Sequence, residues 1–371
     1  MLYGSVRFLP GFSVWRFTIG SLMLCLSACR AADWSDPPLV AIQAAQNSLA
    51  QNSLTQNSQG TIVQFEFASD FSEGLAAVKT DRGYAYIDRT GQTVLEVDPG
   101  LDGVSAFVEQ RAVVRVADLY GYIDRTGKIV VDPQFGTANL YSQGLAVVRS
   151  GRGYGYLDRS GQWAIDPEFR LATDFSEGLA AVKPDEQYGY INLLGDWVIR
   201  PQYEDAWIFQ ESLAVIKQGN RWGYLDVNGQ VAIEPQFDGA FSFSETLGRV
   251  RQGSQWGFVN SQGELVIPPQ FDFAADFSEG LAAVLVGNQW GYVDRTGKLV
   301  IAPQFDFAAD FSEGLAAVTL NRQIGFIDAT GSLKIAPQFD QTGAFSEGWV
   351  WVQTGNQRRY INPAGEFLHR S

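Results

Sequence analysis

Short apolar runs separated by polar corners recur along most of the chain. In one stretch, residues 281–284 are apolar throughout, residues 290–294 alternate between apolar and polar positions, and residues 298–301 form a third apolar run. Runs of this length, bounded by Gly, Asp and Pro, are typical of β-strands. The corner at 294–297 reads Asp-Arg-Thr-Gly, in which Asp can accept from the backbone two residues on and Gly supplies a positive φ. The pattern predicts a three-stranded meander that Pro303 ends.

This unit occurs nine times with a period of 34 residues. An aromatic-Gly-aromatic triplet recurs from 120–122 to 290–292 in steps of 34, and the loop Phe-Ser-Glu-Gly recurs in the same frame. The turn glycines are Gly91, Gly127, Gly161, Gly195, Gly229, Gly263, Gly297, Gly331 and Gly365. In a strand, Trp290 and Tyr292 point to one face, so Gly291 leaves a gap on the other that a neighbouring backbone can fill.

A lone meander has nothing to cover its apolar face, so the units must pack on their neighbours. We expect an all-β chain of nine three-stranded units stacked as an open β-solenoid. A closed, β-propeller-like array is the alternative. Propeller blades usually have four strands and number roughly four to eight, which nine three-stranded units fit poorly. Residues 62–71 also supply only a strand remnant and a loop, whereas the last unit, 349–368, looks complete.

The N-terminal 28 residues have the order of a secretory signal. Arg7 and Arg16 precede an apolar run from Phe17 to Ala28, and the segment contains no acid. The run ends Leu-Ser-Ala-Cys, which resembles the lipobox of bacterial lipoproteins. The resemblance implies that residues 1–28 are removed and that Cys29 is acylated, so the membrane would be a partner through that lipid. An ordinary signal peptide is the alternative.

A polar spacer follows the predicted anchor. Residues 46–60 contain three near-copies of a Gln-Asn-Ser pentapeptide, and no charged residue lies between Pro37 and Phe65. Such a segment has too little apolar surface to offset the entropy of ordering, so residues 29–60 are predicted to be a flexible tether. An amphipathic helix over 38–50 is the alternative. The repeat domain is predicted over 61–371.

Composition narrows the chemistry. The chain has 371 residues, 27 Lys and Arg against 41 Asp and Glu, and a formal net charge of -14. Such a balance lacks the bulk positive surface that nucleic-acid binding needs. The single histidine is His369, and the two cysteines lie at the N-terminus. The chain therefore has too few His and Cys residues for a catalytic triad or a His-rich metal site. We predict no enzyme, no metal and no cofactor.

The repeat resembles the WG-repeat family of bacterial proteins, built from tandem units with a Trp-Gly strand and a later Pro-x-Phe segment. The resemblance covers roughly residues 61–371. Pro-Gln-Phe begins at Pro133, Pro235, Pro269, Pro303 and Pro337, although Trp fills its place in only three units. The family implies a binding or scaffolding role without a shared enzymatic activity, so no catalytic residue is carried over.

Several repeated side chains are candidates for function. The Glu of each Ser-Glu-Gly loop could form a calcium ladder, but each unit brings too few oxygens together; bonding to loop amides or to water is the favoured interpretation. The first aromatic residues of the triplets form a ladder along the chain, and this aromatic ladder is interpreted mainly as core packing. Aromatics outside the ladder are the candidate partner contacts, because exposed Trp tends to mark contact surfaces. They are Trp163, Trp197, Trp207, Trp349 and Trp351.

The sequence thus predicts an exported cell-envelope lipoprotein. Its repeat body would be a non-enzymatic scaffold for a protein or polysaccharide partner. A carbohydrate-binding module or a structural spacer of the envelope is the alternative. Almost every acid has an equivalent 34 residues away, which suits an extended surface better than a single reaction centre.

Overall fold

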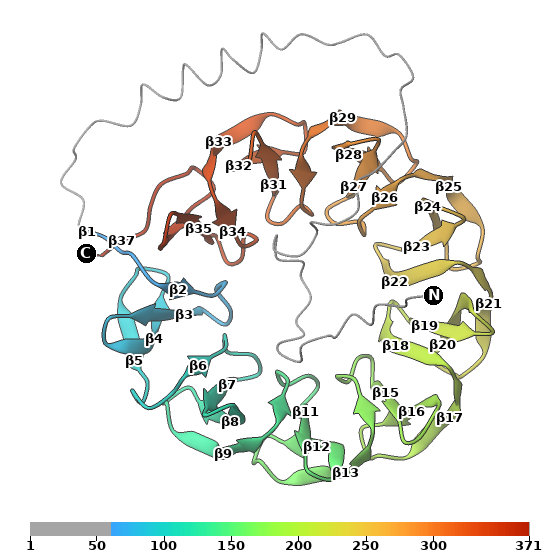
Figure 1. The fold of residues 1–371 in the computed structure, drawn as a ribbon, viewed down its shortest axis with the longest axis horizontal. Coiled ribbons are helices and arrows are strands. Elements are labelled where there is room, and N and C mark those ends of the chain that lie inside the picture. Colours follow the sequence, from blue (N-terminus) through green and yellow to red (C-terminus); the bar gives the residue numbers. More distant parts are fainter. Residues whose placement is uncertain (1–60, 371) are drawn as a thin grey trace, which may run out of the picture.

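The computed structural model describes residues 61–370, and these form a closed ring of nine β-blades around a central opening (Figure 1). The predicted open solenoid is therefore wrong, and the fold is a nine-bladed β-propeller. Eight blades are four-stranded antiparallel sheets, and the ninth contains a three-stranded sheet. In each blade the first strand lies nearest the opening and the last lies at the circumference (Figure 1).

The blades follow one another in chain order. Blade 1 contains β2 (Phe67–Ala68), β3 (Leu75–Thr80), β4 (Gly83–Asp88) and β5 (Thr93–Glu96). Blade 2 contains β6 (Gly103–Val104), β7 (Arg111–Val116), β8 (Leu119–Asp124) and β9 (Ile129–Phe135). Blade 3 contains β10 (Thr137–Ala138), β11 (Leu145–Ser150), β12 (Gly153–Asp158) and β13 (Trp163–Phe169). Blades 4 to 6 contain β14 (Leu171–Ala172), β15 (Leu179–Lys183), β16 (Tyr188–Asn192) and β17 (Trp197–Tyr203); β18 (Asp205–Gln210), β19 (Leu213–Gln218), β20 (Arg221–Asp226) and β21 (Val231–Phe237); β22 (Gly239–Ser244), β23 (Leu247–Gln252), β24 (Gln255–Val259) and β25 (Leu265–Phe271). Blades 7 to 9 contain β26 (Phe273–Ala274), β27 (Leu281–Val286), β28 (Gln289–Asp294) and β29 (Leu299–Phe305); β30 (Phe307–Ala308), β31 (Leu315–Leu320), β32 (Gln323–Asp328) and β33 (Leu333–Phe339); β34 (Gln341–Thr342), β35 (Val350–Thr354) and β36 (Gln357–Ile361).

The predicted meander corresponds to the second, third and fourth strands of a blade. The innermost strand was missed because it has only two residues in most blades, as in β26, too few to show any periodicity. The corner before β29 is as predicted: the Asp294 carboxylate accepts from the backbone N–H of Thr296 at 2.9 Å, and Gly297 has a φ of +83°. Pro303, however, does not end its strand, because β29 continues to Phe305.

The hydrophobic core is divided among the nine junctions between blades. At each junction the buried side chains of one blade's second, third and fourth strands meet the first three strands of the next. In the junction between blades 4 and 5, for example, Tyr190 and Ile199 pack in one cluster with Phe209 and Ile216. The last aromatic residue of each triplet is fully buried there, and the Tyr190 hydroxyl donates to the Trp207 carbonyl of the next blade at 2.9 Å. Each blade thus covers its neighbour.

The glycine of each aromatic triplet faces the proline of the following strand. In blade 6, Trp256 pairs with Phe271 and Phe258 pairs with Ile267, so three residues bulge opposite Gly257. A Cβ on Gly257 would lie 2.4 Å from the Ile267 carbonyl oxygen and 2.6 Å from the Pro269 nitrogen. The predicted gap is therefore filled by the backbone of the fourth strand, and Pro sits in a bulge where it costs no ladder hydrogen bond.

The N-terminal segment closes the ring. Phe65 and Arg358 of β36 exchange backbone hydrogen bonds of 2.9 and 3.0 Å, and β1 (Thr61–Ile62) pairs with β37 (His369–Arg370). Phe65 takes the position that Phe339 has in blade 8, where Phe339 pairs with Ile324. The strand remnant at the start of the domain is thus the missing edge of blade 9. This contact overturns the open arrangement.

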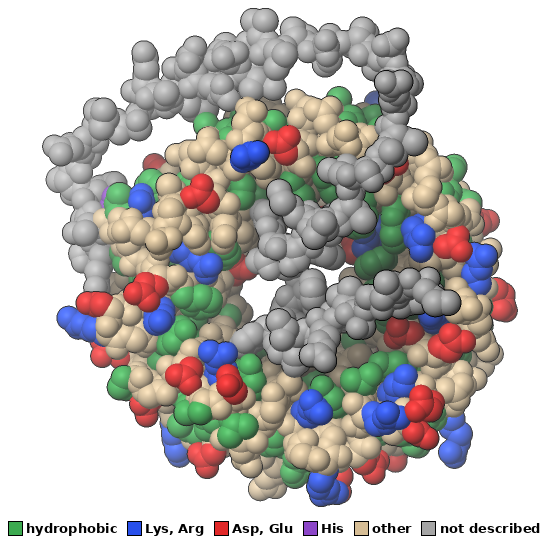
Figure 2. Space-filling view, viewed as in Figure 1, with side chains coloured by type: hydrophobic (Ala, Val, Ile, Leu, Met, Phe, Trp, Pro, Cys, Tyr) green, Lys and Arg blue, Asp and Glu red, His purple; other side chains and the backbone are tan. Residues whose placement is uncertain are grey.

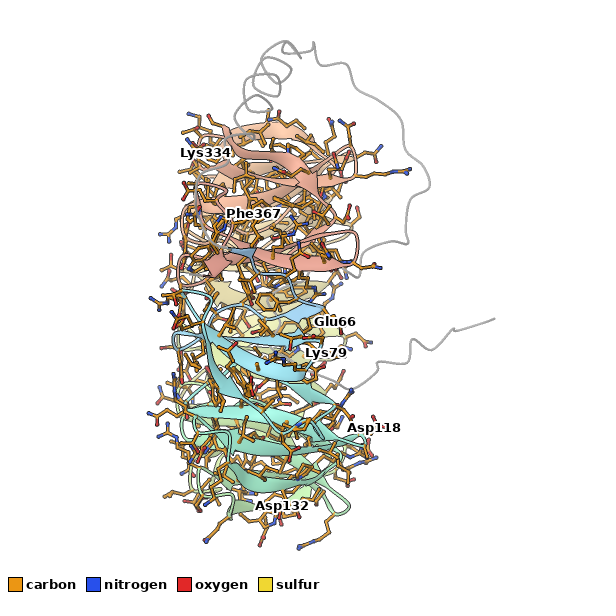
Figure 3. The ribbon with its side chains drawn as sticks, turned by 90° about the vertical axis from the view of Figure 1, so that its left-hand side faces the viewer. Glu66, Lys79, Asp118, Asp132, Lys334 and Phe367 are labelled. Carbon is orange, nitrogen blue, oxygen red and sulfur yellow. The ribbon has the colours of Figure 1, made fainter. Side chains whose placement is uncertain are left out.

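The ring has two unlike faces. The turns between second and third strands lie on the face seen in Figure 1, which we call the front face. The Ser-Glu-Gly loops and the Asp-Arg-Thr-Gly turns lie at the opposite strand ends, on the back face. Figure 3 turns the ring by 90° and places Lys79 and Asp118 toward the front face and Lys334 toward the back.

Candidate binding surface around the central opening

Six consecutive blades carry a cation at the same register position of the second strand. These front-face cations are Lys79, Arg115, Arg149, Lys183, Lys217 and Arg251. Each lies opposite the first aromatic residue of the triplet on the third strand, as Lys79 does opposite Tyr84 and Lys217 opposite Trp222. The Lys183 ammonium lies 5.0 Å from the centroid of the Tyr188 ring, and the Lys217 ammonium lies 5.7 Å from that of Trp222. The rings are half-buried.

These cations are largely free of carboxylates. Among the described residues, only Lys79 of the six lies within 4 Å of one, the Glu66 carboxylate at 3.4 Å, and Figure 3 shows the two side chains near the front face. Arg251 donates to the carbonyls of Gly253 and Asp238 at 2.8 and 2.9 Å. The front-face view in Figure 2 shows Lys and Arg side chains distributed around the ring, with Asp, Glu and hydrophobic side chains among them. The front face thus carries a repeated set of cations among its acids.

A continuous arc of aromatic rings adjoins these cations in blades 5 to 8. Neighbouring ring centroids along it lie 5.1–5.9 Å apart, within the range of favourable aromatic pairs. In order, the aromatic arc consists of Trp222, Trp207, Phe241, Trp256, Phe273, Trp290 and Phe307. Six of the seven rings are half-buried and Trp290 is buried. The arc therefore presents ring edges and faces beside the opening.

Two substitutions in the repeat extend the arc into blades 5 and 6. In blade 1, Ser69 accepts a hydrogen bond from the Ala77 amide at 3.0 Å and so holds the loop that follows the first strand. Trp207 and Phe241 replace that serine in blades 5 and 6. There the first strands, β18 and β22, extend to six residues, and the large rings turn toward the neighbouring third strands.

Arg249 occupies the middle of the arc. Other blades have Ala, Val or Trp at this position, but Arg249 is 1% exposed. Its guanidinium carbon lies 3.8 Å from the centroid of Phe241 and 5.2 Å from that of Trp256. It forms an ion pair of 3.1 Å with Asp276 and donates to the Ala274 carbonyl. Burial lowers the pKa of Arg249 and raises that of Asp276, and their mutual attraction opposes both shifts. This cation joins blades 6 and 7.

The back face carries a ring of acceptors. In each Ser-Glu-Gly loop or its variant, the second side chain accepts a hydrogen bond from a backbone amide in the next blade's loop, as Glu279 does from Gly314 at 2.9 Å. Gln143 replaces Glu in one blade and accepts from Gly178 at the same distance. Glu347 accepts from Gly74 at 2.9 Å and so completes the circle. The prediction that these acids bond loop amides is confirmed.

One carboxyl group beside these loops has an unusual pKa. Asp174 precedes the Phe-Ser-Glu-Gly loop of blade 4, and burial raises its pKa to about 6. The Asn139 side-chain amide donates to it at 2.9 Å and partly opposes the shift.

The five predicted contact residues lie in three separate regions. Trp163 and Trp197 lie on the fourth strands β13 and β17 at the circumference, 38% and 36% exposed. Trp207 belongs to the aromatic arc. Trp349 and Trp351 lie in blade 9 at the closing junction, where Trp351 is 7% exposed and Trp349 packs against the same cluster. The structure does not bring these five side chains together.

Single residues do not reveal the front-face cations or most of the arc, because both are recognisable only as a pattern along the chain. The signal was available: a Lys or Arg recurs at the 34-residue period through six units, and a single Arg interrupts an otherwise apolar strand at Arg249. A separate cavity of about 430 Å³ lies at the closing junction between Phe65, Lys79 and Gln357. It is not continuous with the arc residues.

Two further findings concern residues 61–370. This part of the chain has no helix with the length and apolar character needed to cross a membrane. It also has no group of three or more His, Cys, Asp or Glu placed to hold a metal ion. The predicted signal segment, the anchor Cys29 and the tether all lie outside the described residues.

One known structure has a similar overall fold. A crystal structure of the eukaryotic initiation factor aligns with a TM-score of 0.61 and 10% identity over 80% of this chain and 95% of that one. The WD40 domain of SCAP from fission yeast gives a TM-score of 0.38 and 10% identity, over 82% and 96%. The extracellular domain of the one component system BT4673 from B. thetaiotaomicron gives a TM-score of 0.33 and 12% identity. That alignment covers 81% of this chain and 53% of that domain. At these identities the initiation factor supports the fold alone.

Sequence comparison identifies the repeat. A search of curated proteins finds no significant match. Eight segments match the family described as WG containing repeat: 57–84, 120–152, 154–186, 188–222, 222–256, 256–290, 290–322 and 324–357. They cover more than half of the chain and share the frame of the blades. The chain therefore belongs to the WG containing repeat family.

Proposed function

We propose that this protein is a cell-envelope lipoprotein whose propeller is a non-enzymatic scaffold that binds a polysaccharide or protein partner at its front face. The observation that supports this most is the joint placement of the front-face cations and the aromatic arc around one mouth of the opening. Accessible aromatic and Arg side chains are the groups that binding surfaces favour. The back-face carboxylates, by contrast, are engaged in hydrogen bonds between blades.

Anchoring is proposed through an acylated Cys29. The 31 residues from 30 to 60 connect it to β1, and a flexible chain of that length has a root-mean-square span of roughly 30 Å. Such a tether would let the ring turn relative to the membrane. Two or more acyl chains are needed for lasting attachment, since each buried CH₂ contributes about 0.8 kcal/mol.

Cell fractionation tests the anchor. We expect the full chain in the membrane fraction, and the Cys29→Ser variant in the soluble envelope fraction. Cys25→Ser is the matched control, because that residue would leave with the signal and should not alter the distribution. If Cys29→Ser stays with the membrane, the anchor lies elsewhere.

Site-directed crosslinking in intact cells tests the binding role. A photoreactive residue replacing Lys183 on the front face should yield a discrete adduct with a protein or glycan. The same residue replacing Lys128, an exposed back-face position, should yield much less. Equal adducts from both positions would contradict a front-face site, and no adduct from either would favour the structural spacer.

A further inference from the structure

We infer that the front-face mouth binds an acidic polysaccharide, with the cations pairing its anionic groups and the neighbouring aromatic rings stacking on its sugar faces. This inference rests on the proposed binding role and names the chemical class of the partner. It depends on three properties of the front-face cations: they are not needed for folding, they are available, and they are repeated beside aromatic rings.

The chain itself shows that the fold does not need these cations. Leu285 and Thr319 occupy the same register position in blades 7 and 8. Both blades keep four strands in the same order as the others. A position that accepts Leu and Thr in two blades has no structural demand for Lys or Arg, yet six successive blades carry one.

The cations are available to a ligand. Arg149 is exposed and Lys183 and Lys217 are partly exposed, and none of the three has a carboxylate within 4 Å among the described residues. Their charged ends lie 5.0–5.8 Å from the centroids of the neighbouring rings. Asp205 attracts both Lys183 and Lys217, which lowers its pKa against the larger effect of burial, so an anion at the mouth would compete with that carboxylate for these two cations.

The rings beside the cations select a sugar polymer over a simple polyanion. Five of the six cations lie 5.0–5.8 Å from the centroid of a Tyr or Trp ring. The electron-rich face of such a ring attracts the weakly positive C–H groups that line one side of a pyranose. One cation and one ring therefore recur per blade, which suits a chain of repeating anionic sugars.

The back face would not compete for the same ligand. Eight of the nine loop acceptors there are Glu, with Gln143 as the exception. Four of these carboxylates pair with an Arg, as Glu109 does with Arg159 at 2.8 Å, and the others keep their charge near solvent. These carboxylates would repel an anionic polymer from the back-face loops. The front face also carries acids, among them Asp81, Asp118 and Asp185 in the turns between second and third strands, so binding there depends on the repeated cations and not on a net positive charge.

Binding of polygalacturonate, a uronic acid polymer, to the full-length protein tests the inference. The test variant is Arg149→Gln/Lys183→Gln/Lys217→Gln on the front face. The control is Lys128→Gln/Arg200→Gln/Lys298→Gln, which removes the same charge from exposed positions away from the mouth. We expect at least a tenfold loss of affinity in the front variant at low salt, less than twofold in the control, and no binding of dextran of equal length. Thermal unfolding of both variants should stay close to that of the parent.

Each alternative result is decisive. Equal losses in the two variants, or equal binding of dextran, would overturn the inference. So would equally tight binding of polyglutamate or single-stranded DNA, because charge alone would then suffice. If polygalacturonate does not bind but the Lys183 crosslink still captures a partner, the polysaccharide assignment fails and the proposed function stands. If neither occurs, both fail.

Discussion

Gly257 and Pro269 lie opposite each other in the outer half of blade 6. The bulge around Pro269 requires a Gly opposite it, and the Gly leaves the space that the bulge fills. The bulge that contains Pro269 brings the fourth-strand backbone against Gly257, where no side chain fits. Blade 1 supports this account: it has Ala85 in place of Gly, and Ala85 pairs directly with Glu96 without a Pro bulge. The Trp-Gly and Pro-x-Phe signatures are thus two halves of one contact.

A Gly257→Ala substitution should therefore be destabilising. The added Cβ would lie 2.4 Å from a backbone oxygen, and relieving such a contact typically costs about 1–3 kcal/mol. Gly151→Ala is the control, since nothing lies within 4 Å of its Cβ. Denaturant unfolding should show a lower midpoint for the first variant only. Equal midpoints would mean that the bulge adjusts freely.

Asp174 should make stability depend on pH. Its pKa rises from 3.8 to about 6 in the folded protein, so the folded state holds the proton more tightly than the unfolded state. The stabilisation is therefore complete below pH 3.8 and is lost as pH rises to about 6, at most roughly 3 kcal/mol. Asp174→Asn should be more stable than the parent at pH 7, and the difference should shrink toward pH 4 in thermal unfolding. A constant difference would exclude this titration.

At the scale of an element, the Ser-Glu-Gly turns join the blades through their side chains. Glu279 and Gly280 both have positive φ, which is typical of a two-residue hairpin turn. This backbone aims the carboxylate at the next blade. Glu279→Gln should preserve the bond to the Gly314 amide, as Gln143 does naturally. Glu279→Ala should lose it, at a cost of about 0.5–1.5 kcal/mol.

Hydrogen exchange of the Gly314 amide distinguishes these outcomes. We expect faster exchange in Glu279→Ala than in Glu279→Gln. The replacing Ala and Gln must both adopt the positive φ of position 279, so backbone strain alone does not explain a difference between them. If the two variants exchange alike, the carboxylate contributes through charge and not as an acceptor.

The sequence predicted the elements that have a local signal. The turn at 294–297 and the β-strands around it follow from nearest neighbours along the chain. The first aromatic residues of the triplets, interpreted mainly as core, are half-buried apart from Trp290. The innermost strands do not, because a two-residue strand such as β30 has no period and forms only where β31 offers an edge. The front-face cations could have been predicted from their period, whereas the aromatic arc depends on contacts between blades.

At the scale of the whole molecule, closure depends on a few residues at the N-terminal end of the domain. Phe65 is 5% exposed and packs on Tyr360 with their ring centroids 6.0 Å apart. The two positions are 295 residues apart in sequence, so no local pattern could reveal the contact. Only the similarity of Val-Gln-Phe at 63–65 to Pro-Gln-Phe hinted at it.

Phe65→Ala should open the ring. Removing a buried Phe side chain costs about 3–5 kcal/mol, and Phe339→Ala, the equivalent change inside blade 8, is the matched control. Both variants should be less stable, but only Phe65→Ala should expose β36 to rapid hydrogen exchange. Equal exchange of residues 357–361 in the two variants would show that other contacts hold the ring shut.

Because β37 and Phe65 share the edge of blade 9, the first and last portions of the domain must meet during folding. The first of them is synthesised about 300 residues before the second. Until then the early segment has no partner, and the unfinished blade offers a bare strand edge that another copy could occupy. Closure within one molecule therefore competes with exchange of the edge between two copies, and a higher concentration of folding chains should favour the exchange.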